Sequence, residues 1–235
     1  MTQVPEPYLS TETTPHPIYP MPLVRIDLVL LSVKDDNLQV LLSHRKEAPF
    51  KGFWGLPGGV LRIDLDDSFE CAAQRVASER IGRRLENLSQ VVAVGGAKRD
   101  PRAPWAMSVV YRSMVPPDLY TIPGKRVMQL AWYSVDELSQ HKRIAFDHRE
   151  LVNRAVQGLR GEIRDLHFPA GGISQEFTVG ELQAYSEAIL GESLDKVTFR
   201  RRIDTANVLQ AIPGKVRGGA HRPAQLYRFR GEIHE

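Results

Sequence analysis

Residues 76–80 contain the side chains whose types and spacing bear most directly on chemistry. Val76, Glu79 and Arg80 stand at positions i, i+3 and i+4, so on a helix they share one face. A carboxylate at each of these positions would hold Mg²⁺, a hard cation that prefers oxygen ligands and polarises a bound diphosphate. The three side chains present have a formal charge of zero. We therefore expect weak Mg²⁺ binding at most, no required cofactor and no metal-dependent hydrolysis.

Arg80 has two interpretations at this stage. An arginine at this position can pair with a phosphate group through two parallel N–H donors. Alternatively, it is an ordinary solvated side chain on the helix surface. Val76 is expected to belong to the core under both interpretations.

A glycine-rich loop and one amphipathic helix must position these side chains, within residues 52–82. Asp67 is expected to cap the helix, with Glu70 as its capping-box partner. Gly82 is expected to end it in the left-handed conformation. Helical spacing predicts a buried face made by Phe69, Ala72, Ala73, Val76, Ala77 and Ile81. Cys71, the one cysteine of the chain, is expected on this face as a small buried side chain, so disulfides are excluded.

This stretch resembles the Nudix box, whose family pattern is G-x5-E-x7-R-E-U-x-E-E-x-G-U. The sequence "WGLPGG" looks like the usual entry to the box, and three later positions agree with the pattern: Arg75, Glu79 and Gly82. Three glutamates of the pattern are replaced, by Asp67, Val76 and Arg80, and the loop after Gly59 is two residues longer. The resemblance implies an α+β Nudix-like fold, with a mixed sheet between helices, and a pocket for a nucleoside diphosphate derivative.

The same resemblance suggests which residues form that pocket. The glycines of the loop and the remaining box carboxylate are Gly58, Gly59 and Glu79. Candidates to hold the phosphates are Arg45, Arg80, Arg99 and Arg102. Candidates to stack on the base are Phe53, Trp54 and Trp105. Each aromatic residue has packing in the core as its alternative, and for Trp54 we favour core packing.

The composition indicates a soluble globular protein of one or two domains. The chain has 235 residues and is 42% apolar, which is enough for a sizeable core. Residues 1–20 are rich in Pro and Thr without periodicity, which predicts a disordered arm and no signal peptide. No stretch approaches the roughly 20 apolar residues of a membrane span. We therefore expect a cytoplasmic protein without membrane contacts.

The rest of the first 165 residues alternates strand and helix patterns. Strands are predicted at 24–33 and 38–45, joined by the turn "KDDN", and again at 88–96, 107–115 and 128–134. A short helix is expected to begin at Asp136 and Glu137. A longer helix is predicted from Leu151, Val152, Ala155, Val156 and Leu159. We assign residues 21–165 to the Nudix-like domain and place the boundary in the Pro- and Gly-containing segment that follows.

Residues 166–235 predict a small winged helix-turn-helix domain. Thr178 is expected to cap a first helix with Glu181 as its capping-box partner, and Gly191 to end it. A second helix is expected to extend to Leu209, and its predicted apolar contacts are Val197, Phe199, Ile203, Val208 and Leu209. A basic loop rich in glycine then closes on "LYRF", as in the wing.

Positive charge is concentrated in this domain. Residues 194–230 contain nine lysines and arginines and two aspartates, a net charge of +7, whereas the whole chain has +3. A basic second helix and wing are typical of proteins that bind the DNA backbone. The candidate DNA-binding residues are Lys196, Thr198, Arg200, Arg201, Arg202, Lys215, Arg217, His221 and Arg222. The alternative is a solvated cationic surface.

The combination of the two domains resembles the NrtR family of transcriptional regulators. "LDKVTFRRRI" and "RPAQLYRF" are close to C-terminal motifs of that family. The resemblance implies a homodimeric repressor, often of NAD-related genes, that binds a near-palindromic operator and senses a nucleotide such as ADP-ribose. Two alternatives stay open: an active Nudix hydrolase with an accessory nucleic-acid-binding domain, and a nucleic-acid-binding protein whose Nudix domain only dimerises.

Overall fold

The computed structural model describes residues 21–141, 143–218 and 223–231. The arm predicted at residues 1–20 lies outside these ranges. Within them, no helix combines the length and the apolar character that crossing a membrane requires.

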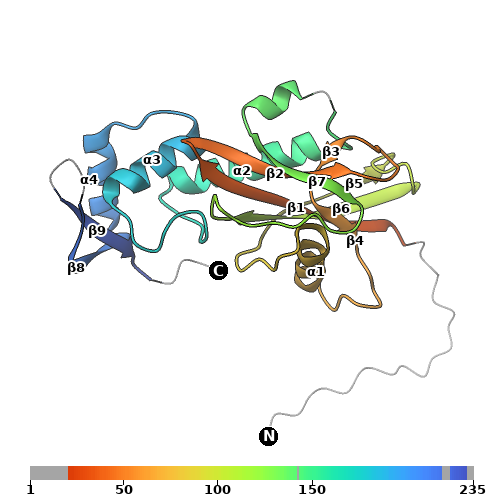
Figure 1. Cartoon of the computed structure of the whole chain (residues 1–235), viewed down its shortest axis with the longest axis horizontal. Helices are drawn as coiled ribbons and strands as arrows, with labels where there is room; N and C mark the ends of the chain where they lie inside the picture. Colours follow the sequence, from red (N-terminus) through yellow and green to blue (C-terminus); the bar gives the residue numbers. More distant parts are fainter. Residues whose placement is uncertain (1–20, 142, 219–222, 232–235) are drawn as a thin grey trace, which may run out of the picture.

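A seven-stranded mixed sheet forms the larger part of the molecule (Figure 1). Its strands are β1 (Leu23–Lys34), β2 (Asn37–Arg45), β3 (Trp54–Gly55), β4 (Gly58–Val60), β5 (Ser89–Ala97), β6 (Trp105–Met114) and β7 (Val127–Ser134). β1 runs parallel to β6 and antiparallel to β2 and β4, while β2 also pairs antiparallel with β3 and β7. β5 completes the sheet as an antiparallel neighbour of β6. The predicted mixed sheet is therefore confirmed.

The sheet is buried on both faces because β1 is apolar at consecutive positions. Ile26, Leu28 and Leu30 pack on the side of α1 (Phe69–Ile81). Val29 and Leu31 pack on the side of α2 (His148–Arg164). Figure 1 shows these two helices on opposite sides of the sheet, and the short 3₁₀ helix η1 (Glu137–Gln140) follows β7. The arrangement is the predicted sheet between helices.

The start of α1 differs from the prediction. Ser68, not Asp67, is the N-cap, and its hydroxyl accepts a hydrogen bond from the Cys71 N–H. Both residue types cap helices well, so the sequence alone did not decide between neighbours. Cys71 is exposed and Phe69 is 39% exposed, so neither belongs to the predicted buried face. The other five predicted residues are buried, and Gly82 ends the helix with a φ of 68°.

The C-terminal domain contains α3 (Val179–Leu190), α4 (Lys196–Ala206) and the hairpin β8 (Leu209–Arg217) and β9 (Ala224–Phe229). The Thr178–Glu181 capping box is present, and Gly191 ends α3 in the left-handed region, as predicted. The second helix is shorter than predicted, because Asn207 adopts a left-handed conformation and Leu209 begins the wing. Val197 is 77% exposed, so its prediction as an apolar contact was wrong.

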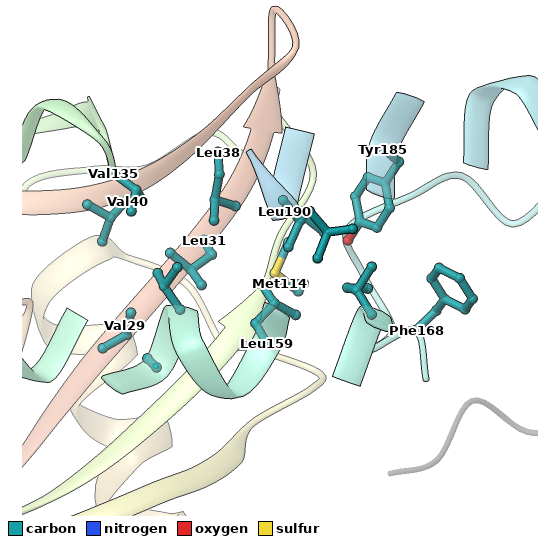
Figure 2. Packing of buried hydrophobic residues seen from close by; sticks show 14 of the residues in the cluster. Val29, Leu31, Leu38, Val40, Met114, Val135, Leu159, Phe168, Tyr185 and Leu190 are labelled. Carbon is teal, nitrogen blue, oxygen red and sulfur yellow. The ribbon is translucent and has the colours of Figure 1, made fainter. Parts of the chain in front are cut away.

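One hydrophobic core extends through both domains. Leu31 and Leu38 of the β1–β2 hairpin, Leu159 of α2 and Leu190 of α3 belong to the same buried cluster. Figure 2 shows these side chains together with Tyr185 and Phe168. Within the C-terminal domain, two backbone hydrogen bonds of 3.0 and 2.7 Å join Phe177, before α3, to Tyr227 of β9. Between the domains, α3 contacts β1, β2 and α2. The winged domain is therefore packed directly onto the end of its own Nudix sheet.

Candidate nucleotide pocket and nucleic-acid interface

A strongly cationic pocket lies where β1, β2, β4 and α1 meet. Five arginines from different parts of the chain contribute to its wall, together with Glu47 as the opposing charge. The arginines are Arg25, Arg45, Arg80, Arg102 and Arg126. Arg102 also pairs with Asp100, and Arg126 lies 3.2 Å from Glu47. Such a density of guanidinium groups around one hollow suits a ligand with several negative charges, because N–H groups not bonded within the protein can donate to a phosphate.

Two glycines allow the backbone of β4 to form the floor of the pocket. A Cβ added at Gly58 would come within 2.2 Å of an Asp27 carboxylate oxygen, and one added at Gly59 within 2.8 Å of a Val76 methyl. Any larger residue would therefore separate β4 from β1 or from α1. The glycine-rich loop is required for close packing at this position.

Arg80 is fixed in the pocket by two backbone acceptors. Its Nε donates to the Gly58 carbonyl at 2.8 Å, and Nη1 donates to the Lys125 carbonyl at 2.7 Å. Burial lowers the pKa of Arg80, although the group stays charged near neutral pH because arginine begins so high. These two bonds contradict the interpretation of Arg80 as an ordinary solvated side chain.

The box helix does not fit a Mg²⁺ site. Val76 is fully buried and Arg80 directs its guanidinium toward the glycine loop, so two expected carboxylate positions cannot act as ligands. The remaining carboxylate, Glu79, lies 3.2 Å from Arg75, which also forms two 2.7 Å bonds with Asp66. Among the described residues no three acidic, histidine or cysteine side chains gather as metal ligands.

An aromatic ring supports two of the pocket arginines. The guanidinium carbon of Arg45 lies 5.0 Å from the centre of the Phe146 ring, and that of Arg25 lies 5.5 Å from it. Arg45 also donates to the Pro49 carbonyl over 3.0 and 2.7 Å. Burial, with a smaller contribution from Arg25, lowers the pKa of Arg45 to about 10. These contacts hold the two cations in place before any ligand arrives.

A buried polar network lies beneath the pocket. Asp27 is fully buried and accepts a bond from the Ser108 hydroxyl, while Arg25 approaches its other oxygen at 3.4 Å. Burial alone would raise the pKa of Asp27, but the nearby Arg25, His148 and Ser108 outweigh it and lower that pKa to about 2. Asp27 is therefore an anion that helps position the cations above it.

His148, the first residue of α2, belongs to the same network. Its Nδ1 accepts the Leu56 N–H at 2.8 Å, so the neutral ring carries its proton on Nε2, 3.8 Å from Asp27. Burial lowers the pKa of His148 to about 4 despite the adjacent Asp27. The bond spans 92 positions of the sequence and fixes the loop after β3 against α2.

The exposed side of α4 forms the candidate nucleic-acid interface. The helix begins at the N-cap Asp195, which accepts the Thr198 N–H at 2.9 Å, and is anchored by buried Phe199 and Ile203. Lys196, Thr198, Arg200 and Arg201 are exposed. Asp195 and Asp204 are the acidic residues near these cations. This surface can approach the phosphate backbone and the edges of bases.

The wing residues make ion pairs within the domain. Lys215 pairs with Glu176, and Arg217 donates to Glu181 at 2.8 Å. Glu181 therefore uses one oxygen to cap α3 and the other to hold the wing. Both pairs are solvent-exposed, so they are weak enough to be exchanged for phosphate groups.

Comparison with known proteins settles the family. A model of the NUDIX domain matches residues 23–155, more than half of the chain, and a model of the NrtR DNA-binding winged helix domain matches residues 173–229. The ADPR responsive transcriptional repressor NtrR of Acinetobacter baylyi is 35% identical over 212 residues, which cover 90% of this chain and 83% of that protein. The chain belongs to the NrtR family.

Solved structures of NrtR extend this relationship. The crystal structure of Shewanella oneidensis NrtR complexed with a 27mer DNA matches with a TM-score of 0.73 at 31% identity, over 88% of this chain and 93% of that chain. The NUDIX domain of the same protein, complexed with ADP ribose, matches with a TM-score of 0.56 at 31% identity, over 60% of this chain and 90% of that one.

In this NrtR-family chain, half of the predicted ligand residues line the pocket. They are Arg45, Gly58, Gly59, Arg80 and Arg102. Glu79 and Arg99 do not line it, since Glu79 pairs with Arg75 and Arg99 holds Asp147 at 2.8 and 2.9 Å. Arg99 also lies 3.7 Å from Asp27, so it supports the pocket from below.

None of the predicted stacking residues lines the pocket of this NrtR-family chain. Trp54 packs edge-on against Tyr133 with ring centres 5.0 Å apart, as favoured from the sequence. Phe53 contacts Phe50 edge-on at 5.7 Å. Trp105 is 46% exposed and lies across Gly95, where an added Cβ would approach it within 2.5 Å.

Among the predicted DNA-binding residues, Arg202 occupies a different environment. Its guanidinium donates to the Arg164 carbonyl at the end of α2. In this structure Arg202 therefore joins α4, the recognition helix of the winged domain, to the Nudix domain. His221 and Arg222 lie outside the described residues.

Sequence reasoning missed five of the residues described above in or around the pocket: Arg25, Asp27, Arg126, Phe146 and His148. A signal for the first two was present, because "VRIDLVLL" places two charges at i, i+2 inside an apolar strand, on one side of it. Phe146 and His148 gave no local signal. Their role depends on contacts with residues about 90 to 120 positions away, made only in the folded chain.

Proposed function

We propose that this protein is a DNA-binding transcriptional repressor whose Nudix domain senses ADP-ribose or a closely related nucleoside diphosphate. The observation that carries the proposal is the composition of the pocket wall: five arginines surround the glycine loop, with Arg80 where a hydrolase of this fold has a metal-binding carboxylate. Such a site supplies anion affinity without a metal. Relatives described as ADPR responsive and as binding DNA and ADP ribose support the same assignment.

The sensing site is proposed to bind without hydrolysis. Attack on a diphosphate at neutral pH in this fold relies on metal-bound water, and the box residues present do not suit a metal. Arg80 supplies charge to the phosphates but neither generates hydroxide nor removes a proton. The alternative, an active hydrolase, depends on Glu79, whose carboxylate is 34% exposed and adjacent to Arg75.

The DNA-binding form is proposed to be a homodimer on a near-palindromic operator, in control of NAD-related genes. One small winged domain reads few base pairs, so two copies related by two-fold symmetry would read half-sites one or two turns apart, at roughly 10 bp per turn. The nucleotide can change DNA affinity only as far as it binds one dimer geometry better than the other.

Selection from random-sequence DNA with the full-length protein tests this proposal directly. We expect a near-palindrome to be enriched, two chains to bind each duplex, and ADP-ribose to shift the DNA affinity whereas ribose 5-phosphate does not. If no DNA sequence is enriched, the proposed repressor function is wrong. If ADP-ribose leaves the DNA affinity unchanged, the proposed sensing function is wrong.

A further inference from the structure

The recognition helix exposes an aliphatic side chain within its cationic surface. Val197 is 77% exposed and lies in a shallow hollow on α4, whose wall is formed by Lys196, Val197, Arg200, Arg201, Asp204 and Thr205. Its methyl groups are therefore available to a partner that fits between the neighbouring cations.

Val197 does not contribute to the packing of the folded protein. The helix is anchored by Phe199 and Ile203, which are 4% and 2% exposed, and Val197 shares none of that burial. A β-branched residue also has a lower helix propensity than the straight-chain residues around it. Neither packing nor helix stability accounts for this side chain.

Its place in the helix indicates what it contacts. Asp195 caps the helix, so Val197 is the second helical residue. In a helix-turn-helix, the N-terminal residues of the recognition helix reach the base edges in the major groove. The apolar group presented there is the C5-methyl group of thymine. The cations beside Val197 have hydrogen-bond donors for phosphates and purines but no comparable preference for a methyl group.

We propose, building on the DNA-binding function above, that Val197 packs against the C5-methyl group of one thymine in each half-site and is a specificity-determining residue. Val216 on the wing, at 53% exposed, is the other exposed valine of the described C-terminal domain, but it lies between Lys215 and Arg217 on β8, away from the start of the helix.

Deoxyuridine substitution tests the contact, because it removes the thymine methyl and leaves base pairing intact. The operator selected by the full-length protein is resynthesised with each thymine replaced singly by deoxyuridine. For the wild type we expect one thymine per half-site at which the replacement lowers affinity about fourfold, the effect of exposing one methyl group. Val197→Ala should bind the thymine operator more weakly by a similar factor and lose the distinction at that position.

Val216→Ala provides the matched control, since it makes the same substitution at the exposed valine of the wing. It should retain the full difference between thymine and deoxyuridine. Melting temperatures should be unchanged in both variants, because both side chains are exposed. A thymine preference that persists in Val197→Ala, or that disappears in Val216→Ala, would overturn the inference while leaving DNA binding intact. Failure of the wild type to select any DNA would instead remove the proposed function itself.

Discussion

Arg80 donates from Nε to the Gly58 carbonyl over 2.8 Å, which ties the C-terminal turn of the box helix to the strand that forms the pocket floor. The bond orients the guanidinium toward the hollow between Arg25, Arg45 and Arg102. A metal-binding carboxylate is thereby replaced by a preformed cationic donor.

Removing the Arg80 guanidinium should weaken nucleotide binding. Arg80→Ala deletes one phosphate-facing charge and two bonds that order the loop, so we expect ADP-ribose affinity to fall by about tenfold to a hundredfold. Titration calorimetry measures the change. Arg83→Ala is the matched control, because Arg83 follows the same helix but donates to the Tyr120 carbonyl outside the pocket. Equal affinities for Arg80→Ala and the wild type would rule out the phosphate role.

Hydrolysis should be undetectable. With Mg²⁺ or Mn²⁺, purified protein is expected to release no AMP from ADP-ribose above the buffer rate, since Val76 and Arg80 cannot coordinate the metal. Glu79→Gln should be indistinguishable from the wild type in this assay. An active Nudix pyrophosphatase run in parallel shows that the conditions support turnover. Robust wild-type turnover that disappears in Glu79→Gln would establish the hydrolase alternative.

Stability should decrease in acid because of His148. Its folded pKa of about 4 lies below the ordinary value of 6.5, so the unfolded chain binds the extra proton first. The contribution of His148 to the free energy of unfolding is complete above pH 6.5 and is lost as pH falls toward 4. The full loss is about 3 kcal/mol. Urea unfolding at pH 7.5 and pH 5 measures the loss.

His148→Asn separates this titration from others. The asparagine oxygen can still accept the Leu56 N–H but has no proton to gain, so the slope between pH 6.5 and 4 should become shallower. Asp27, with a folded pKa of about 2, loses its stabilising charge only below the ordinary aspartate pKa near 3.8. A variant with the same slope as the wild type would exclude His148 as the cause.

Adjacent arginines of the recognition helix should behave differently on DNA. Arg201 is exposed, whereas Arg202 donates to the Arg164 carbonyl. Arg201→Ala should therefore remove a phosphate contact and reduce the slope of log K against log salt by about 0.9. Arg202→Ala should leave that slope unchanged and lower the melting temperature slightly. Fluorescence anisotropy at several salt concentrations compares them, and equal slopes for both variants would contradict the assignment.

Much of the fold was predictable because its signals are local. The apolar run of β1, the helical spacing of α2 and the Thr178–Glu181 capping box each depend on residues near one another in sequence. The errors in α1 have a local cause as well. Asp67 and Ser68 are equally suitable caps, and the small alanines of the buried face do not show how far around the helix that face extends. Cys71 and Phe69 lie at those edges.

The pocket was predictable only in part, because half of it is assembled by distant contacts. Arg45 and Arg80 belong to segments already marked by the glycine loop and the box helix. Phe146 and His148 lie at the start of α2. The residues next to them in the sequence do not indicate that the Phe146 ring contacts Arg45 or that His148 accepts the Leu56 N–H. Arg99 was predicted for its charge, but whether it faces a ligand or a carboxylate such as Asp147 is decided by the fold.

The core shared by the two domains limits how this regulator can be taken apart or recombined. Phe177, Leu182 and Ile189 are fully buried, and the cluster to which they belong includes residues of β1, β2 and α2. A gene fragment encoding only residues 166–235 would lack the residues of β1, β2 and α2 that complete this cluster. We expect its product to be less stable than the same domain in the full-length protein. Because α2 packs against both the sheet and α3, a chimera joined on either side of this helix would break the shared core.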